Sequence, residues 1–563
     1  MSTIIGIDLG TSTTEAAVLR NGRPELILNF DGEKITPSVV GMDDSGTILV
    51  GEPALTRQLL APENTILEIK RKMGSRETVR LGNSSFTPEE ISAQILSYVR
   101  RFASAYLEED ISQAVISVPA YFDEIQRQAT VEAGKRAGFT VERILNEPTA
   151  AAMSYGLSHL EEESHILVYD LGGGTFDVTL LEMFDGVLEV KASSGDNRLG
   201  GKDFDQKLIE FLLESFREKH GIDLQGDIHA MARLKAEAVK CKIALSSEER
   251  VNVVIPLIAE KDGKPLALEE EITRTMFEEL IGELVDRTHD PIDVVLKDAN
   301  ISEKELDMVL LVGGSTRVPL IRRDIADYLG IEPVQAVDPD YAVAEGAAIQ
   351  AGILSGELDG EESLIMTDVN PYTLGIRAIS GYRDDYMSVV IPRNTTIPVT
   401  KKEMYYTSWD GQTSADIEVY QGEFSSVDQN HRLGSFRLLG IPVNRAGEEK
   451  LEVAFSYNLD GMLSVSAVIV STGEAAEITI DMLERGRLER IDVSGWKEAP
   501  LAGSFRTVIR RSEKWLKANR AEAEDDVIRE MEENLYLLKK AIIENNKAEA
   551  EEYEDELRFG MGD

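Results

Sequence analysis

The chain has 563 residues, which predicts about three or four folding units, since a typical domain holds roughly 150 residues. Hydrophobic residues make up 42% of the sequence, enough for compact cores, so the chain is not globally disordered although 28% of its residues are charged. The 101 acidic residues outnumber the 59 Lys and Arg and give a net charge of −42. Such a surface repels phosphate backbones and anionic lipid, so we expect neither nucleic acid nor a membrane as the main partner.

The single cysteine, Cys241, excludes an internal disulfide or a multi-thiolate metal site and fits a reducing compartment. The chain starts without the charged and apolar regions of a signal peptide, and no apolar run approaches the roughly 18 residues of a membrane span. We therefore expect a cytoplasmic protein. For Cys241 itself, a small packed side chain is favoured over a redox switch, although the neighbouring Lys240 and Lys242 could lower a thiol pKa.

Up to about residue 355, short Val/Ile/Leu runs alternate with longer helical stretches, a rhythm typical of α/β structure. One example is a strand over 114–118, a helix over 127–138 and a strand over 143–145. Within this part, the run IIGIDLGT at 4–11 is echoed by LVYDLGGGT at 167–175. The echo predicts two similar halves.

After Gly352 the pattern changes. A short acidic stretch over 356–362 gives way to the apolar residues Leu364, Ile365 and Met366, and then to about 120 residues with strand signals. Apolar residues alternate over 451–457 and again over 463–469, with Asp460-Gly461 as a hairpin turn between them. This part is predicted to be an antiparallel β domain.

The last part of the chain has a helical pattern, since no Gly or Pro occurs from Ser504 to Phe559. One apolar stripe is formed by Ile528, Met531, Leu535, Leu538 and Ile542. A small bundle that packs on itself is favoured over a coiled-coil dimer, because the stripe spans only about two heptads where three or four would be needed.

Two segments place an acidic residue at the end of a predicted strand before a tight Gly/Thr turn. They are Asp8-Leu9-Gly10-Thr11 and Asp170-Leu171-Gly172-Gly173-Gly174-Thr175. The carboxylate can hold Mg²⁺ through water, while glycine N–H groups and threonine hydroxyls can approach phosphate oxygens closely. A lone copy would most often be only a turn. Two copies that face each other across a cleft favour a site for nucleotide phosphates.

A third glycine turn, Gly313-Gly314-Ser315-Thr316-Arg317, follows the apolar run 308–312. It is either another strand-to-helix turn or a wall of a nucleotide site in which Arg317 stacks on the base. Lys70 lies in the run EIKRKMG, which by composition alone indicates a solvated basic patch. Glu147 precedes Pro148 and so suits the first turn of a helix, where it would act as a cap.

Longer motifs follow one another along the whole chain. They are IDLGT at 7–11, VPAYF at 118–122, NEPTAAA at 146–152, DLGGGTFD at 170–177, the segment from Gly195 to Phe204, IPRNTTIP at 391–398, QGE at 421–423 and DGMLSVSA at 460–467. In this order they resemble the seventy-kilodalton heat-shock (DnaK-type) chaperone family over about residues 3–480. The runs KRKMGS at 70–75 and TDVNPY at 367–372, with the short total length, resemble its HscC-like branch more than DnaK itself.

The resemblance implies a multidomain protein with a duplicated, actin-like α/β ATPase domain over 1–357 and an interdomain linker over 358–369. An antiparallel β-sandwich that binds peptides would cover 370–485, and a short helical lid 486–563. The implied activity is that of an ATP-dependent chaperone, in which ATP hydrolysis controls the affinity for exposed apolar segments of unfolded proteins. The implied cofactors are ATP or ADP, Mg²⁺ and, as a further cation, K⁺. The implied partners are client polypeptides, a J-domain co-chaperone and a nucleotide-exchange factor.

By resemblance, the phosphate turns are Gly10, Thr11 and Ser12 in the first half and Gly172, Gly173, Gly174 and Thr175 in the second. Asp8 and Asp170 would organise hydrated Mg²⁺, and Lys70, Glu147, Asp170 and Thr175 would surround the attacking water. Phosphoryl transfer needs such groups because positioning and charge compensation carry most of its catalysis.

The resemblance also assigns the residues that hold the ribose and adenine, which are Lys242, Ser246, Gly314, Arg317 and Asp340. Further residues expected to bind the nucleotide are Gly200, Gly201, Gly313 and Ser315. Val239 departs from the family, which commonly has a Glu that reaches the ribose at this position.

The implied coupling device begins with Pro119 and Arg127, which match the family's proline switch and arginine relay. Leu364, Ile365, Met366 and Asp368 fall on the interdomain linker. An exposed apolar tetrad over 364–367 is hard to explain in an acidic linker unless it docks, although an ordinary buried strand would also fit.

In the implied peptide channel, Met387 and Ser408 arch over the peptide and Tyr405 and Ala415 line a pocket. Ala415 replaces a Val and Ser408 an Ala, so the client preference is expected to differ. Beyond residue 485 the resemblance fades, and a small lid with fast peptide exchange is expected.

Three other classes would use part of the same pattern. A sugar or acetate kinase and an actin-like filament protein share the phosphate turns but leave the linker and β domain unexplained. A nucleotide-exchange co-chaperone derived from the family would bind ATP without peptide-stimulated turnover. Only an ATP-driven chaperone uses every segment.

Overall fold

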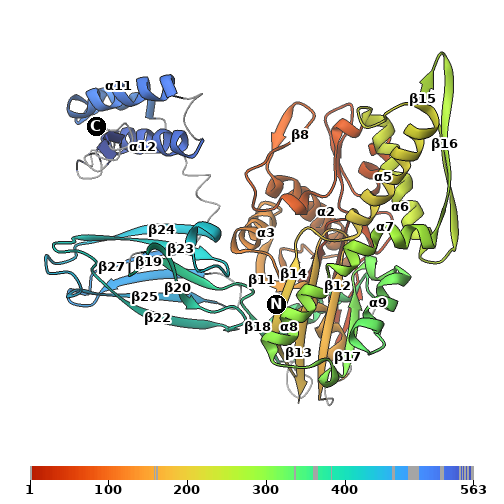
Figure 1. The fold of residues 1–563 in the computed structure, drawn as a ribbon, viewed down its shortest axis with the longest axis horizontal. Coiled ribbons are helices and arrows are strands. Elements are labelled where there is room, and N and C mark those ends of the chain that lie inside the picture. The colour runs from red at the N-terminus through yellow and green to blue at the C-terminus, as the bar shows by residue number, and fades with distance from the viewer. Residues whose placement is uncertain are drawn as a thin grey trace. The chain divides into compact units, whose positions relative to one another are not determined.

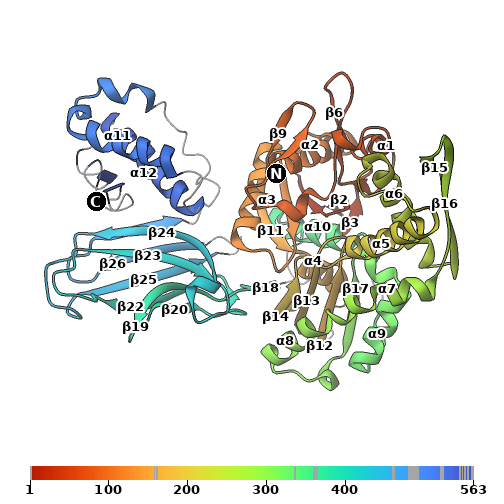
Figure 2. The same ribbon diagram turned by 45° about the horizontal axis from the view of Figure 1, so that its top comes forward.

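The computed structural model of the chain describes residues 3–157, 159, 163–184, 186–334, 338–358, 365–381, 383–458, 463–479, 493–519, 525–543, 547, 550, 553–554 and 557–558. The chain divides into two compact units, Met1–Met482 and Leu483–Asp563. The first unit contains an α/β part and a β-rich part, and the described elements of the second are helical (Figures 1 and 2).

The first lobe of the α/β part is built on a sheet in the order β11-β10-β1-β2-β3, with β4 paired to β2. Its strands are β1 (Ile4–Leu9), β2 (Thr13–Arg20), β3 (Arg23–Leu26), β4 (Thr36–Pro37), β10 (Gln113–Val118) and β11 (Thr140–Asn146). β10 runs parallel to β1, whereas β2 returns antiparallel, so that Asp8 lies opposite Glu15.

The second lobe repeats this arrangement with β12 (Ser164–Leu171), β13 (Phe176–Phe184), β14 (Val187–Asp196) and β17 (Met308–Val312). Their order, β17-β12-β13-β14, corresponds strand for strand to β10-β1-β2-β3. Asp170 lies opposite Asp177 in the register of β12 and β13, as Asp8 lies opposite Glu15. The predicted pair of similar halves is confirmed.

Two helices of small residues join the lobes, α4 (Glu147–Gly156) and α10 (Ala342–Ser355). A side chain at Gly346 would collide with the backbone of Ala150, and one at Gly6 would collide with Ala348. Glycine at these two positions therefore lets α10 lie directly against α4 and β1. This tight packing holds the ends of β1 and β12, where the acidic turns begin, in one region.

The predicted strand-helix-strand segment is observed as β10, α3 (Glu124–Arg136) and β11. The helix begins earlier than its apolar pattern predicts because Asp123 caps it, accepting a hydrogen bond from the Gln126 N–H at 2.8 Å. The other α/β helices are α1 (Glu52–Gln58), α2 (Pro88–Leu107), α5 (Gly201–His220), α6 (Ile228–Leu245), α7 (Arg274–Asp286), α8 (His289–Ala299) and α9 (Pro319–Leu329).

Smaller elements complete the α/β part. They are the 3₁₀ turns η1 (Pro62–Asn64), η2 (Ile69–Lys72), η3 (Glu303–Glu305) and η4 (Gly314–Arg317), and the strands β5 (Val40–Met42), β6 (Ile48–Val50), β7 (Thr65–Ile66), β8 (Val79–Leu81), β9 (Ser84–Phe86), β15 (Arg250–Lys261) and β16 (Lys264–Thr273). β15 and β16 pair as a hairpin that projects beyond the helices in both ribbon views (Figures 1 and 2).

The β-rich part consists of two four-stranded sheets, ordered β20-β19-β23-β24 and β22-β25-β26-β27. The strands are β19 (Leu374–Ser380), β20 (Arg383–Ile391), β22 (Val399–Tyr406), β23 (Ser414–Gln421), β24 (His431–Leu439), β25 (Lys450–Tyr457), β26 (Leu463–Ile469) and β27 (Ala475–Thr479), and a 3₁₀ turn, η5 (Val427–Gln429), precedes β24. Alternate residues such as Val453, Phe455, Val465 and Ala467 share one buried core. The antiparallel prediction is confirmed, and the proposed Asp460-Gly461 turn lies outside the described residues.

The segment between the two parts contains β18 (Ile365–Val369), which extends the second-lobe sheet. Ile365 and Met366 lie opposite Val187 and Leu188 of β14 in a parallel pairing. On its other side β18 pairs with β21 (Thr396–Ile397) of the β-rich part. The apolar linker residues that are described therefore form a docked strand, and Leu364 lies outside the described residues.

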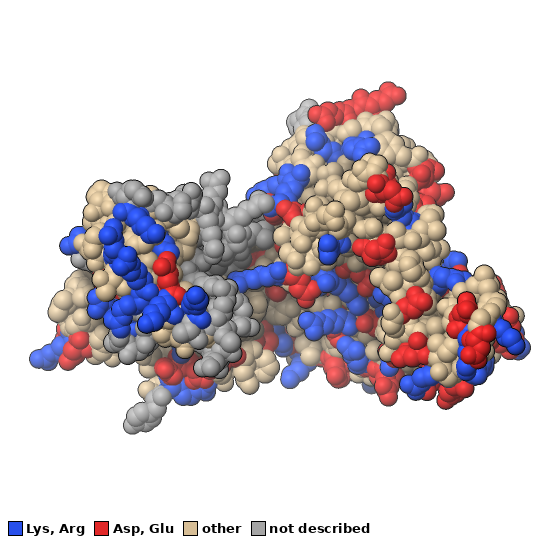
Figure 3. Space-filling model, turned by 90° about the horizontal axis from the view of Figure 1, so that it is seen from above, with Lys and Arg blue, Asp and Glu red and all other residues tan. Residues whose placement is uncertain are grey.

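The second unit contains η7 (Val493–Glu498), α11 (Ala502–Asn519) and α12 (Asp525–Ile543). Trp496, Phe505, Ile509, Leu538 and Ile542 form its buried core, so the described helices pack on each other as the small-bundle prediction requires. Arg506, Arg510, Lys514 and Lys517 follow the exposed side of α11, and Figure 3 shows basic side chains gathered over this helix. Among the described residues, no helix is long and apolar enough to cross a membrane.

Candidate active site

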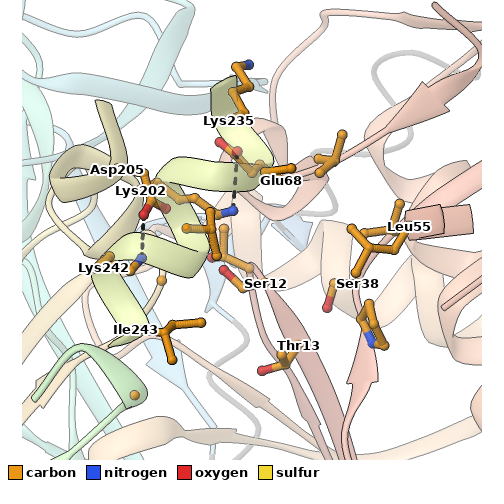
Figure 4. A pocket seen from close by; sticks show the side chains of 18 of the residues that line it. Ser12, Thr13, Ser38, Leu55, Glu68, Lys202, Asp205, Lys235, Lys242 and Ile243 are labelled. Atoms are coloured by element: carbon orange, nitrogen blue, oxygen red, sulfur yellow. Dashed lines mark ion pairs between the residues drawn. The ribbon is translucent and has the colours of Figure 1, made fainter. Parts of the chain in front are cut away.

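A cavity of about 930 Å³ opens between the two lobes. Thr11 and Ser12 line it from the first acidic turn, Gly173 from the second and Gly314 from the third. α6 adds Lys242 and Ile243, and α1 adds Leu55, as Figure 4 shows for the labelled side chains. The three glycine turns of the sequence therefore converge on one cavity.

The first two turns touch each other. A side chain at Gly173 would collide with Ser12, and one at Gly174 would lie 2.8 Å from Thr11 Cγ2. The second turn is closed by a hydrogen bond from the Gly172 N–H to the Thr175 carbonyl at 3.0 Å. Because bare glycine backbone faces the first turn, both turns can approach the same phosphate group.

Three of the four predicted catalytic residues, Lys70, Glu147 and Asp170, are buried close enough to interact electrostatically, and the fourth, Thr175, belongs to the second turn. Lys70, in η2, and Glu147, the first residue of α4, form a buried ion pair with Nζ to Oε1 at 2.5 Å. Asp170 is buried near the end of β12, and the carbonyl of Thr175 closes the turn that follows this strand. The solvated basic patch expected from composition is wrong for Lys70, which is 5% exposed.

The sequence around Lys70 explains this burial. Arg71 donates to Asp203 at 2.6 Å and to the Gly174 carbonyl at 3.1 Å, so it connects η2 to the second turn. Lys72 points the other way and pairs with Glu77 at the surface. One basic run therefore supplies a buried cation, a connecting side chain and a solvated one.

Carboxylates crowd this buried region. Burial raises the pKa of Asp170 well above its usual value, and repulsion from Glu147, Asp177 and Asp8 adds to the rise while Lys70 opposes it. Burial likewise raises the pKa of Glu147, against the attraction of Lys70. Burial and repulsion from Glu147 raise the pKa of Asp177 to about 7. One lysine does not balance this charge, so the site favours a bound cation.

Asp8 is held for such a role by Ser117, whose hydroxyl donates to Asp8 Oδ1 at 2.7 Å. Burial raises the pKa of Asp8, and Lys70 and Ser117 lower it. The described residues include no group of three or more His, Cys, Asp or Glu side chains arranged to hold a metal directly. Carboxylates are the side chains by which a hydrated Mg²⁺ is held, so Asp8 and Asp170 fit such an ion.

The predicted nucleoside residues form the wall of the cavity around α6 and η4. Lys242 pairs with Asp205 at 2.8 Å and donates to the Gly201 carbonyl at 3.0 Å. The Ser315 hydroxyl donates to the Gly172 carbonyl at 2.8 Å and so joins the third turn to the second. Arg317 is held at the rim by Asp340 at 2.6 Å and Asp338 at 2.9 Å.

The predicted residues divide into two groups. Those that line the cavity are Thr11, Ser12, Gly173, Lys242, Ser246, Gly314, Ser315, Arg317 and Asp340. Those that are not part of its lining are Asp8, Gly10, Lys70, Glu147, Asp170, Gly172, Gly174, Thr175, Gly200, Gly201 and Gly313. Val239, the departure from the family, is part of the lining, together with Ile243 and Leu55, which no sequence signal marked.

The predicted coupling residues connect the site to β18. Arg127 donates to Asn146 Oδ1 at 2.7 Å and to the Ala120 carbonyl at 3.0 Å, beside Pro119. Asn146 in turn donates to Asp368 at 2.9 Å. In the sequence Asn146 is marked only as the first residue of NEPTAAA, yet its side chain joins Arg127 to Asp368 of β18.

The α/β and β-rich parts also meet directly. The Tyr372 hydroxyl donates to the Tyr121 carbonyl at 2.8 Å, and Asp298 accepts from both Arg393 and Asn394 at 2.8 Å. The Tyr457 hydroxyl lies 3.4 Å from Glu124 Oε2. β18 is therefore one of several contacts that hold the two parts together.

The four residues assigned to the peptide channel separate into different surroundings. Tyr405 and Ala415 pack against the β-rich core, and the Tyr405 hydroxyl donates to Ser388 at 3.0 Å. Met387 is 2% exposed and packs with Tyr420 and Val427. Ser408 is exposed. The structure thus brings Tyr405 and Ala415 into one cluster and leaves Met387 and Ser408 outside it.

Cys241 lies on α6 and is 1% exposed. Burial, together with a smaller effect of the Glu237 charge, raises the pKa of its thiol to about 12. The lowered pKa considered for a redox switch is therefore wrong, and the packed side chain is confirmed.

Comparison with known proteins agrees with this geometry. The family described as Hsp70 protein matches residues 4–80 and 76–559 of the chain. The chain is 48% identical over 480 residues to the chaperone protein DnaK of Thermotoga neapolitana and to that of Thermotoga maritima, which covers 85% of this chain and 80% of each relative. The DnaK of Thermosipho africanus is 46% identical over 479 residues, which cover 85% of this chain and 79% of the relative. The chain belongs to the Hsp70 family.

Proposed function

We propose that the α/β part hydrolyses ATP and thereby controls how firmly the β-rich part holds extended, apolar segments of unfolded proteins. As an Hsp70-family protein, the chain is an ATP-dependent chaperone and an ATPase. The observation that carries the assignment of the site is the buried Lys70–Glu147 pair beneath two touching glycine turns.

In the proposed reaction, Thr11, Ser12 and the Gly172–Gly174 backbone hold the phosphates of ATP. Lys70 offsets charge that develops on the γ-phosphoryl oxygens. Glu147 and Asp170 orient the attacking water in line with the γ-phosphate, and Thr175 positions it by its hydroxyl. Asp8 and Asp170 would hold Mg²⁺ through water, and the ion would neutralise part of the negative charge of the phosphates.

The proposed nucleoside wall consists of Lys242, Ser246, Gly314, Arg317 and Asp340. Gly200, Gly201, Gly313 and Ser315 are proposed as further residues that bind the nucleotide. The departure of this wall from the family is Val239, whose apolar side chain lines the cavity where a Glu would offer an acceptor to the ribose. We expect Val239→Glu to tighten ADP binding by a few fold, a gain typical of one added hydrogen bond. K⁺ is proposed as a further cation of this site.

The proposed coupling route leads from Glu147 through the adjacent Asn146 to Asp368 on the docked strand β18. We propose an ATPase domain over 1–357, a linker over 358–369, a peptide-binding domain over 370–485 and a helical lid over 486–563. Pro119, Arg127, Leu364, Ile365 and Met366 would report the nucleotide state to the peptide-binding domain.

Clients are unfolded polypeptides, and Tyr405 and Ala415 are proposed to form a pocket for one apolar side chain. Ala415 is smaller than the Val that the family has, which favours larger side chains in that pocket. Met387 and Ser408 are proposed to close over the peptide. A small lid would allow fast exchange, so the ATP-free peptide off-rate should exceed that of relatives with a full lid. An off-rate as slow as theirs would contradict this assignment.

A J-domain co-chaperone is proposed to stimulate hydrolysis, and a nucleotide-exchange factor to release ADP. The chain is proposed to act in the cytoplasm, where its lone Cys241 stays reduced. The HscC-like branch remains a prediction from the runs at 70–75 and 367–372. A kinase or a filament protein would leave 370–485 without a role, and transfer of phosphate to a sugar or acetate would favour the kinase.

Single-turnover ATP hydrolysis tests the assigned site. Lys70→Ala and Thr175→Ala should each slow hydrolysis by at least about a hundredfold, because a preorganised charge or donor is lost from the transition state. Lys72→Ala is the matched control, since Lys72 stands in the same run but pairs with Glu77 at the surface. Equal rates for Lys70→Ala and the unchanged protein would contradict the site.

A further inference from the structure

The first lobe carries a buried carboxylate that the proposed reaction does not use. Glu15 lies on β2 directly opposite Asp8 of β1, and it is 2% exposed. The second lobe has the equivalent pair, since Asp177 on β13 lies opposite Asp170 of β12. Each acidic turn is therefore followed by a second carboxylate at the same register position, and Glu15 corresponds to Asp177.

The two equivalent carboxylates differ in how their oxygens are satisfied. Asp177 accepts a hydrogen bond from the Tyr121 N–H at 2.9 Å. Glu15 Oε1 is buried and has no hydrogen-bond partner among the residues that the structure describes. A buried carboxylate oxygen without a partner is destabilising, because burial removes its hydrogen bonds to water and nothing replaces them.

The charges around Glu15 do not supply that partner. Burial raises its pKa well above the usual value, and repulsion from Asp8 and Asp340 raises it further, while a hydrogen bond from Thr13 and the attraction of Lys70 lower it. The first lobe therefore faces the proposed Mg²⁺ site with two adjacent carboxylates, and Lys70, the lysine that attracts both, is already paired with Glu147.

Protonation of Glu15 would remove the charge but not the unsatisfied atom. A protonated Oε1 would become a donor, and a donor in this position would still need an acceptor. A hydrated cation would both compensate the negative charge and satisfy the Oε1 atom, because its bound waters donate strong hydrogen bonds to carboxylates.

We propose that Glu15 is an additional carboxylate of the Mg²⁺ site, which together with Asp8 accepts hydrogen bonds from the water shell of the ion. The inference rests on the proposed nucleotide site and adds to it a residue that the sequence motifs do not mark. Mg²⁺ keeps several waters when it binds and is held by few carboxylates, which fits a site without a direct cage of side chains. An extra carboxylate is expected to tighten Mg²⁺ binding in the complex with ADP.

Calorimetric titration of Mg²⁺ into the ADP complex of the full chain tests this role without any turnover. Glu15→Gln should weaken Mg²⁺ binding by about tenfold, since cation affinity follows the number of ligand charges, while ADP binding without Mg²⁺ stays within about twofold. Glu345→Gln is the matched control, because Glu345 is half-buried on α10 and bonded to Ser154 at 2.9 Å. Glu15→Asp, which keeps the charge, should lose less affinity than Glu15→Gln.

Equal Mg²⁺ affinity in the unchanged chain, Glu15→Gln and Glu15→Asp would overturn the inference and assign Glu15 as a neutral, protonated acid. If Glu15→Gln does not fold, the comparison of Glu15→Asp with the unchanged chain decides, and no loss of affinity there overturns the role. Failure of the unchanged chain to bind ADP would instead overturn the proposed nucleotide site itself.

Discussion

The side-chain amide of Asn146 donates a hydrogen bond to Asp368 at 2.9 Å, and its carbonyl accepts one from Arg127 at 2.7 Å. Asn146 is the residue before Glu147, whose carboxylate pairs with Lys70. A single peptide bond therefore separates the proposed catalytic pair from the residue that holds the linker strand. A shift of α4 as the γ-phosphate leaves would therefore move Asn146 and, through its hydrogen bond to Asp368, would act directly on β18.

Asp368→Ala should uncouple the two parts. Burial raises the pKa of Asp368, while a hydrogen bond from the Val369 N–H, the charges of Arg127 and Arg143 and a hydrogen bond from Asn146 lower it. Loss of the carboxylate leaves the Asn146 amide without its acceptor. We expect that an apolar peptide no longer accelerates hydrolysis in this variant. The rate of hydrolysis without peptide should stay within about threefold of that of the unchanged chain. Single-turnover assays with and without peptide measure both, and Asp428→Ala, at an exposed position, is the control.

A double-mutant cycle sharpens this prediction. If Asn146 and Asp368 act through their shared hydrogen bond, the effects of Asn146→Ala and Asp368→Ala on peptide stimulation should not add, with a coupling energy of about 1–3 kcal/mol. Additive effects would mean that the two residues act independently.

Glu124 makes the contact between the two parts sensitive to pH. Burial raises the pKa of Glu124 from 4.5 to about 8, and it lies at Tyr457 of the β-rich part. Because the pKa is raised in the docked state, the contact keeps its full stability below about pH 4.5 and loses it as the pH rises through about 8.

Energy transfer between dyes on the two parts, followed from pH 6 to 9, should therefore show weaker docking at the alkaline end. Glu124→Gln, which cannot ionise, should flatten that dependence. The same slope in Glu124→Gln and in the unchanged chain would show that another group, such as Asp177, carries the effect.

Asp298 anchors the β-rich part on α8. It accepts from Arg393 and from Asn394 at 2.8 Å each, and its side chain is 17% exposed. We expect Asp298→Ala to weaken docking by about 1–3 kcal/mol, since two donors, one of them charged, lose their acceptor. Hydrogen exchange of β18 should quicken in this variant, and unchanged exchange would contradict an anchoring role.

Cys241 should not react in the native chain. With a pKa of about 12 and almost no exposure, its thiol should resist a disulfide reagent at pH 8 and react at an ordinary rate once urea unfolds the protein. A Cys introduced at exposed Ser45 is the control for reagent access. Rapid modification of native Cys241 would restore the redox-switch interpretation.

Much of the fold could be predicted from the sequence because its signals are local. The echo of Asp8 and Asp170 before glycine turns predicted two lobes, and the alternation over 451–469 predicted paired strands. The burial of Lys70 could not be predicted from composition, because EIKRKMG is basic throughout, and only the family resemblance assigned Lys70 to the catalytic site. The position of Glu147 in the fold decides which lysine turns inward.

The roles of Asn146 and Glu15 were missed for a related reason. Asn146 is a polar residue at the start of a helix, and its partners, Arg127 and Asp368, lie far away in the sequence. Glu15 lies in a strand whose sequence matches no binding motif, and only the register of β1 with β2 shows that it lies opposite Asp8. A comparison of the two internal repeats, which aligns Glu15 with Asp177, was the signal that could have found it.

The central claim is that hydrolysis at the lobe junction is coupled to peptide binding through the docked strand β18. Its most direct test is single-turnover ATP hydrolysis, with and without an apolar seven-residue peptide, in the unchanged chain and in a chain carrying Ile365→Asp and Met366→Asp. These residues pair with Val187 and Leu188. Ile365 is largely exposed, whereas Met366 packs against the buried core of the second lobe, so a charge at Met366 should oppose docking of the strand. The account predicts that the peptide accelerates hydrolysis in the unchanged chain alone. Equal acceleration in both chains would contradict it.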